Sequence, residues 1–226
     1  MDENGLSALP ARLVPWFAAA KRDLPWRRDR EPYHVWVSEI MLQQTRVEAV
    51  VGYYERFLKA LPDIRALADA PEDKLLKLWE GLGYYSRARN LQKAARQVIE
   101  QHDGIFPRDA ADIRALAGIG DYTAGAIGSI CFEYPAAAVD GNVLRVVSRV
   151  TGSDAPIDRP ETKKKIAADL SAVYPAGHCG DFTQSLMELG ATVCTPRGAK
   201  CGVCPLADIC AAKREDRVDA LPVKGE

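Results

Sequence analysis

The chain has 226 residues, of which 47% are hydrophobic and 27% charged, and its formal net charge at pH 7 is −1. These values are typical of a globular protein with one large core or two modest ones. No apolar run approaches the roughly 20 residues that a membrane span needs, and residues 1–20 lack the layout of a signal peptide, so we expect a cytoplasmic protein. The net charge gives no support to nucleic-acid binding, and any basic surface must be local.

Apolar residues recur at helical spacing along nearly the whole chain, and no stretch alternates in the manner of a β-strand. The fold class is therefore predicted to be all-α. In chain order, the spacing predicts helices over 6–20, 33–45, 47–61, 63–69, 72–79, 86–102, two helices within 110–130, and helices over 143–150, 159–173 and 181–193.

The pair of helices within 110–130 is interrupted by Gly118-Ile119-Gly120, and the second helix opens at Asp121. The two glycines let the backbone turn sharply and leave nothing bulky over the second N-terminus. Backbone N–H groups and the helix dipole make such a terminus an anion site that suits a phosphodiester. The alternative is an ordinary helical hairpin.

Four valines at helical spacing between 143 and 150 predict the next helix, with Asn142 as its cap. Asp140 then lies at the start of this helix, where the dipole favours the ionised carboxylate. The alternative for this feature is a simple helix start.

Glu39 is the only charged residue between Val35 and Gln44, and its neighbours are strongly apolar. Desolvation would raise its pKa and keep it protonated near neutrality, unless the side chain points to solvent at the helix edge. A protonated Glu39 and an ionised Asp140 would be the acid and carboxylate that glycosidic-bond cleavage uses. The acid protonates the leaving group and the carboxylate meets the oxocarbenium-like cation.

Four of the six cysteines lie close together in the chain, at Cys194, Cys201, Cys204 and Cys210. Disulfides are rare in the cytosol, so this spacing indicates a metal site. Structural zinc sites are usually built from two close cysteine pairs, and only one such pair is present. The spacing therefore favours a [4Fe-4S] cluster over zinc. The two remaining cysteines, Cys131 and Cys179, are expected in the core or without a role.

These features resemble the helix-hairpin-helix DNA glycosylase superfamily, whose prototype is endonuclease III. Leu116–Gly120 is similar to its hairpin, Val139-Asp140 to its catalytic aspartate motif, and the cysteine spacing to its cluster loop. The resemblance runs from about residue 10 to residue 212. Within the superfamily, the motifs SEIMLQQT at 38–45 and GLGYY at 81–85 closely resemble the MutY family of adenine DNA glycosylases.

The resemblance implies two helical subdomains. One would comprise 1–29 and 135–226, with a [4Fe-4S] cluster loop at 194–210 and a tail or linker at 213–226. The other would be a six-helix-type subdomain at 30–134 that carries the helix-hairpin-helix at 110–130. The implied partner is double-stranded DNA with A:8-oxoguanine or A:G mispairs, bound by a monomer, and the cluster would be structural and DNA-binding.

The resemblance also implies the roles of the residues that remove adenine from its sugar. Glu39 would protonate adenine N7 and then activate water, and Asp140 would stabilise the sugar cation, electrostatically or through a transient covalent bond. Tyr122 and Asn142 would position Asp140 and the sugar. The base pocket and the wedge that enters the duplex would be formed by Trp26, Arg27, Gln44, Tyr84 and Gln184.

The backbone amides near Gly118, Gly120 and Tyr122 would bind a DNA phosphate by the same resemblance, with a monovalent cation held by backbone carbonyls. Endonuclease III-like enzymes carry a lysine two residues after the last hairpin glycine, where this chain has Tyr122. A phenol cannot form an imine, so we expect base removal without an efficient lyase step.

Two alternatives stay open at this point. One is a mismatch glycosylase for thymine or uracil opposite guanine, and the other is a non-catalytic iron–sulfur protein that binds DNA. Adenine glycosylases usually continue into a Nudix-like domain that reads the 8-oxoguanine strand, whereas this sequence stops at Glu226. Whether it is a piece of a longer protein or a natural short form, we expect weakened discrimination for 8-oxoguanine over guanine.

Overall fold

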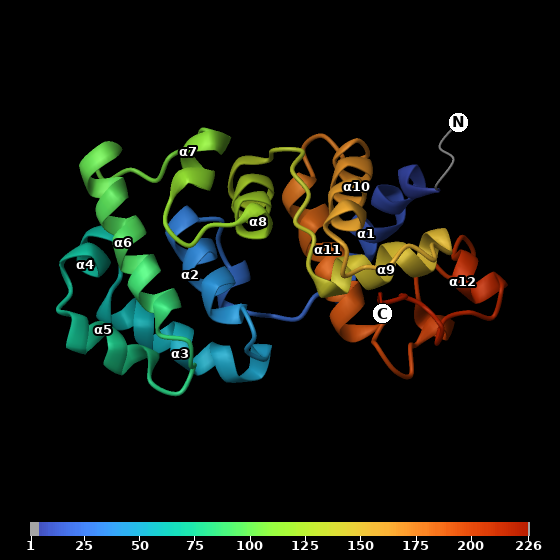
Figure 1. Ribbon diagram of the computed structural model, residues 1–226, viewed down its shortest axis with the longest axis horizontal. Coiled ribbons are helices and arrows are strands. Elements are labelled where there is room, and N and C mark those ends of the chain that lie inside the picture. The colour runs from blue at the N-terminus through green and yellow to red at the C-terminus, as the bar shows by residue number, and fades with distance from the viewer. Residues whose placement is uncertain (1–4, 226) are drawn as a thin grey trace. The chain divides into compact units, whose positions relative to one another are not determined.

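The structure is a computed structural model that describes residues 5–225, and all regular secondary structure in this range is helical (Figure 1). The all-α prediction is confirmed. The chain divides into two compact units. Unit 1 comprises Met1–Arg22 and Phe132–Glu226, and unit 2 comprises Asp23–Cys131. The boundaries predicted from the sequence lie seven residues later at the first crossing, after residue 29, and three residues later at the second, after residue 134.

Unit 2 is a bundle of short helices around a core rich in aromatic residues. Trp36, Phe57 and Trp79 are fully buried in it, and the ring centres of Phe57 and Trp79 lie 6.1 Å apart. Aspartates cap two of the helices: Asp63 accepts from the Ala66 N–H at 2.8 Å, and Asp109 accepts from the Ala111 N–H at 2.9 Å. The elements are η2 (Pro25–Arg27), α2 (Pro32–Leu42), α3 (Val47–Ala60), α4 (Ile64–Asp69), α5 (Glu72–Trp79), α6 (Ser86–Gln101), α7 (Ala110–Ala115) and α8 (Asp121–Phe132).

Unit 1 joins the start of the chain to its second half. Its elements are η1 (Leu6–Ala8), α1 (Leu9–Ala20), α9 (Gly141–Thr151), α10 (Pro160–Ser171), α11 (Cys179–Thr192), η3 (Cys201–Val203) and α12 (Ala211–Arg214). Helix α11 packs against α1 and α9, and the valine face of α9 is buried there. The side chain of Glu188 on α11 is 1% exposed, and Arg22 donates to it from Nε at 2.7 Å. A buried carboxylate needs such a partner because unpaired charge is costly inside a protein.

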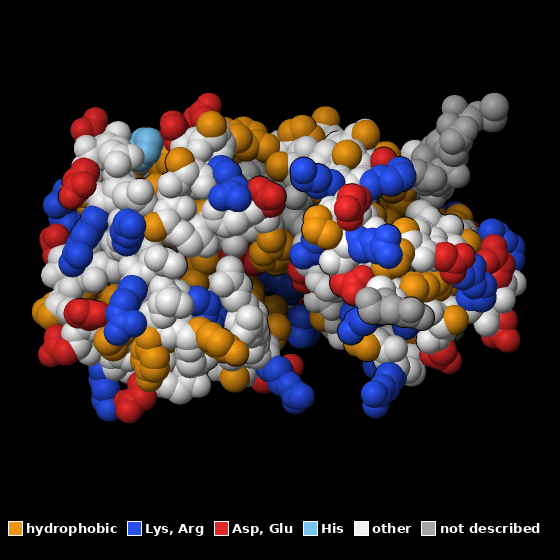
Figure 2. Space-filling view, in the orientation of Figure 1, with side chains coloured by type: hydrophobic (Ala, Val, Ile, Leu, Met, Phe, Trp, Pro, Cys, Tyr) orange, Lys and Arg blue, Asp and Glu red, His pale blue; other side chains and the backbone are white. Residues whose placement is uncertain are grey.

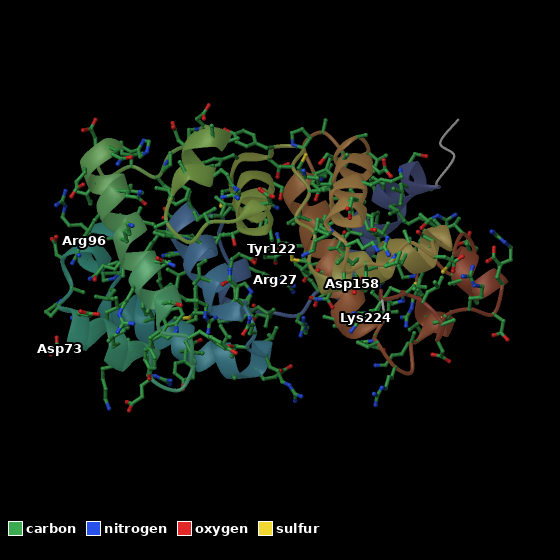
Figure 3. The ribbon with its side chains drawn as sticks, viewed as in Figure 1. Arg27, Asp73, Arg96, Tyr122, Asp158 and Lys224 are labelled. Carbon is green, nitrogen blue, oxygen red and sulfur yellow. The ribbon has the colours of Figure 1, made fainter. Side chains whose placement is uncertain are left out.

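The segment that follows α12 packs onto unit 1. Leu221 is 2% exposed, and its carbonyl accepts from Arg149 Nε at 3.0 Å. The Ile157 N–H donates to the Val223 carbonyl at 2.9 Å, and Figure 3 shows Asp158 and Lys224 close to each other in this region. The structure therefore differs from the predicted tail or linker, because the backbone of this segment has partners on unit 1.

The surface carries charges of both signs. Figure 2 shows Lys and Arg interspersed with Asp and Glu on each unit, in keeping with the net charge of −1. Within residues 5–225 we find no helix with the length and apolar character that crossing a membrane requires.

Candidate active site

Glu39 lies on α2 with its side chain directed into unit 2, where the residue is 7% exposed. The hydroxyl of Tyr122, on α8, donates to Glu39 Oε2 at 2.8 Å. The sequence predicts a buried Glu39, and its burial in unit 2 agrees with that expectation. The resemblance implies that Tyr122 also positions Asp140, and that role stays a prediction.

The thiol of Cys131 forms part of the surroundings of Glu39. Burial raises the pKa of Cys131 to about 12, and the charge of Glu39 adds to this effect, so the two side chains lie within electrostatic reach. At neutral pH the thiol is therefore uncharged. Glu39 is thus held in a poorly solvated site beside a phenol and a neutral thiol, although the sequence alone assigns Cys131 no role.

Asp140 is the N-cap residue of α9. Its Oδ1 accepts from the Val143 N–H at 2.8 Å, and its Oδ2 accepts from Asn142 Nδ2 at 3.0 Å. The prediction that Asn142 caps this helix is wrong, because Gly141 is already helical and the cap lies one residue before it. Both oxygens of Asp140 are held by its own helix, so the direction of the carboxylate is well defined.

Arg145 contacts Asn142, which in turn binds Asp140, and the sequence analysis assigns Arg145 no role. Its Nη2 donates to Asn142 Oδ1 at 2.8 Å and to the Gly190 carbonyl at 2.6 Å, and its Nε donates to the Cys194 carbonyl at 2.7 Å. A Cβ on Gly190 would lie 2.6 Å from Asn142 Cβ, so only glycine permits α11 to approach α9 this closely. The available sequence signal was that Arg145 follows Asn142 by three positions on one helix.

The helix-hairpin-helix is formed by α7, the 116–120 loop and α8, as the sequence predicts. Gly118 has φ +78°, and a Cβ there would lie 3.0 Å from Asn90 Cβ, so glycine is required both for the turn and for the packing. Arg114 supports the loop by donating to the Ile119 carbonyl at 2.7 Å and to Asp121 at 2.8 Å. The phosphate and cation sites at the hairpin stay predictions.

Two predicted wedge residues, Gln44 and Tyr84, have unusual backbone conformations. Their φ angles are +60° and +48°, and both side chains are exposed, Tyr84 to 66%. Non-glycine residues in this region cost about 1–3 kcal/mol each, and such strain is concentrated at functional sites. Asp103, Glu133 and Asp216 share this conformation, and the wedge role of Gln44 and Tyr84 stays a prediction.

The predicted base-pocket residues belong to both units. In unit 2, Trp26 is 8% exposed and packs edge-on against Tyr54, with ring centres 5.5 Å apart. Figure 3 places Arg27 and Tyr122 toward the same end of unit 2, away from Arg96. Gln184 lies on α11 of unit 1 and donates to the Gly180 carbonyl of its own helix at 3.3 Å.

The four clustered cysteines line one cavity in unit 1, together with Arg149 and Lys213. The Leu206 N–H donates to Cys204 Sγ, and Arg149 Nη1 donates to Cys194 Sγ, both at 3.4 Å. Within residues 5–225, no three or more Cys, His, Asp or Glu side chains are arranged to hold a single metal ion. Four thiols that line one cavity, with hydrogen bonds donated to two of the sulfurs, are a donor set that fits a [4Fe-4S] cluster.

The part of the chain that contains Glu39, the hairpin and Asp140 matches a known protein family. Residues 37–175 match the family model of the HhH-GPD superfamily base excision DNA repair proteins. The chain belongs to the HhH-GPD superfamily. The resemblance noted from the sequence motifs is thereby confirmed for the superfamily and its fold.

Adenine DNA glycosylases are among the relatives within the HhH-GPD superfamily. Those of Rattus norvegicus and Homo sapiens are both 42% identical to this chain, over 98% and 99% of its length. The chain covers 45% and 43% of these two proteins, so it spans about half the length of the curated relatives that it matches.

Two solved structures have a fold similar to that of this chain. A thermostable thymine-DNA glycosylase has a TM-score of 0.85 and 29% identity, covering 93% of this chain and 97% of its own. A trapped endonuclease III–DNA covalent intermediate has a TM-score of 0.77 and 23% identity, covering 95% of this chain and 98% of its own. At that identity, the second comparison supports the fold alone.

Proposed function

We propose that this chain carries the catalytic part of a monofunctional adenine DNA glycosylase, which hydrolyses the N-glycosidic bond of adenine mispaired with 8-oxoguanine or guanine. The observation that carries the proposal is the contact between Glu39 and Tyr122. A buried carboxyl group is suited to general acid catalysis, and the phenol beside it has no amine with which to attack the sugar. The 42% identity to adenine glycosylases supports adenine as the base.

The proposed reaction begins with an adenine that has left the base stack, at a cost of a few kcal/mol. Glu39 donates its proton to adenine N7, and the bond between C1′ and N9 breaks with its electron pair going to the base. Adenine therefore leaves as a neutral molecule. Burial of Glu39 favours the protonated form that this step requires.

Asp140 stabilises the positive charge that develops on the sugar. Its two hydrogen bonds, to Val143 and Asn142, hold the carboxylate in place before the charge appears. A water molecule then adds its oxygen to C1′ while its proton passes to the Glu39 carboxylate. The products are free adenine and an abasic site, and both carboxyl groups return to their starting state.

The four cysteines would hold a [4Fe-4S] cluster, which when bound links the loop from 194 to 210 into one rigid element. Positive charge from Arg149 and Lys213 beside the cavity would offset the negative charge of a cluster bound by thiolates. We assign the cluster no part in the hydrolysis. Its loop would instead support α9, because Arg145 and Arg149 bind its backbone carbonyls.

The experiment that tests the function measures base excision on duplexes with a single A:8-oxoguanine, A:G, T:G or U:G pair, with and without alkali. We expect strand breaks on the two adenine duplexes after alkali only, because the abasic site persists when no amine attacks it. A thymine-DNA glycosylase is also similar in fold, so excision of T or U alone would favour a mismatch glycosylase. DNA binding without any excision would overturn the enzymatic assignment.

Arg145 gives a second test of the proposed site. Arg145→Lys is expected to lower the single-turnover excision rate by about 10- to 100-fold, because one ammonium cannot replace donors to Asn142, Gly190 and Cys194 at once. Single-turnover kinetics at saturating enzyme would measure this rate separately from DNA affinity. Lys165→Arg, which changes an exposed pair with Asp169 on α10 of the same unit, is the matched control and should keep the wild-type rate. Equal rates for both variants would contradict the role of Arg145.

A further inference from the structure

The two wedge residues, Gln44 and Tyr84, lie in separate segments that meet at one arginine. Gln44 follows the end of α2, and Tyr84 lies in the loop between α5 and α6. Arg87, in the first turn of α6, reaches both segments. Its Nη1 donates to the carbonyls of Ile40 at 2.7 Å and Gln43 at 2.6 Å, and its Nη2 donates to those of Leu82 at 3.0 Å and Gly83 at 3.2 Å.

The carbonyls of Gln43, at the end of α2, and of Leu82, in the loop, gain a partner in this way. Those of Ile40 and Gly83 also accept from the Gln43 N–H and from Trp79 Nε1. The bonds from Arg87 also help to end α2 at Leu42, whereas the sequence predicts a helix over 33–45. The guanidinium carbon of Arg87 lies 6.0 Å from the ring centre of Tyr84 and 5.4 Å from that of Trp79. Arg87 therefore touches one wedge residue directly and binds the carbonyl immediately before each of the two.

We propose that Arg87 is a positioning residue for base extrusion, which holds Gln44 and Tyr84 in one strained arrangement before DNA arrives. This inference rests on the proposed function. A side chain that enters a base stack must keep its position while it separates the bases. A strained backbone conformation persists only where the surrounding contacts hold it in place. Arg87 supplies those contacts because its planar fork reaches two segments at once, which the single ammonium of a lysine cannot do.

A cavity beside the guanidinium shows that substitution at this position is sterically feasible. Arg87 lines it together with Trp36, Asn90 and Gly118. Arg87 Nε and Trp36 Nε1 are buried there, and neither has a hydrogen-bond partner among the described residues. Because the cavity has polar donors and space, water can replace part of a shortened side chain.

The test compares Arg87→Lys with Arg96→Lys, using two adenine substrates. Arg96 lies on the same helix and donates from Nε to the Ala68 carbonyl at 3.0 Å, far from both wedge segments in sequence. One substrate pairs adenine with 8-oxoguanine, and in the other adenine lies opposite an abasic site, where less pairing must be broken. We expect Arg87→Lys to lower the single-turnover rate by about tenfold on the first substrate and less than about threefold on the second.

Arg96→Lys should change both rates by the same factor, as should any variant that acts only through folding stability. An equal loss on both substrates in Arg87→Lys, or no loss on either, would overturn the proposal. Arg87→Gln, which keeps two N–H donors, is measured in parallel so that the comparison survives if the lysine variant unfolds. If the wild-type chain releases adenine from neither duplex, the proposed function is wrong. If the wild-type chain is active but Arg87→Lys loses the same factor on both duplexes, only the positioning role of Arg87 is wrong.

Discussion

Replacing Glu39 by glutamine is expected to lower single-turnover adenine excision by about 1,000-fold or more, while the duplex affinity changes by less than about threefold. Glutamine has the same shape and can still accept the hydrogen bond from Tyr122, but it has no proton to give to the leaving base. Excision assays at saturating enzyme and a binding titration with the same duplex would separate the two quantities.

The matched control for this variant is Glu48→Gln, on the exposed first turn of α3 in the same unit. It makes the same carboxyl-to-amide change at an exposed position and should leave excision at the wild-type rate. Measurable excision near the wild-type level in Glu39→Gln would assign the proton donor to another group. A parallel loss of excision and of thermal stability would show instead that the variant fails to fold.

Much of the fold was predictable because the spacing of apolar residues along the chain indicates where helices form. The helices predicted at 47–61 and 86–102 are α3 and α6, which the structure ends one residue earlier in each case. The end of α2 was not predictable, because the Arg87 contacts that help to end it come from 44 and 47 residues further along the chain. Local pattern therefore predicted the helices, and tertiary contacts decided where this one stops.

The site shows the same division between local and long-range information. Glu39 was found because a lone charge in an apolar helix is a local signal, and its burial follows from the same neighbours. The contacts of Arg145 and Arg149 have no local signal in the sequence, because their partners at Cys194 and Thr195 lie 49 and 46 residues away. For Arg149 the available sequence feature is its place among the valines of the helix α9, where it is buried with them.

Replacing Cys201 by serine is expected to remove most of the bound iron and to lower the free energy of unfolding of unit 1 by several kcal/mol. The reason is that a metal site built by one folded loop contributes its binding energy to folding. Arg149 is 2% exposed and joins this loop to the segment at Leu221 and to α9, so loosening the loop should also disturb the helix that Asp140 caps. Iron and sulfide analysis, with thermal unfolding of the same samples, would measure both effects.

Cys179→Ser provides the matched control, since Cys179 is 2% exposed in the same unit and its thiol donates to the Pro175 carbonyl at 3.3 Å outside the cysteine cavity. This variant should retain the full iron content, which for a [4Fe-4S] cluster is about four atoms per chain. If metal analysis finds one zinc ion per wild-type chain instead of iron, the proposed cluster is wrong and the four cysteines form a zinc site. A full iron content in Cys201→Ser would remove Cys201 from the ligand set. In the zinc outcome Arg149 would still hold the loop, because its bonds to the Thr195 and Pro196 carbonyls involve no metal ligand.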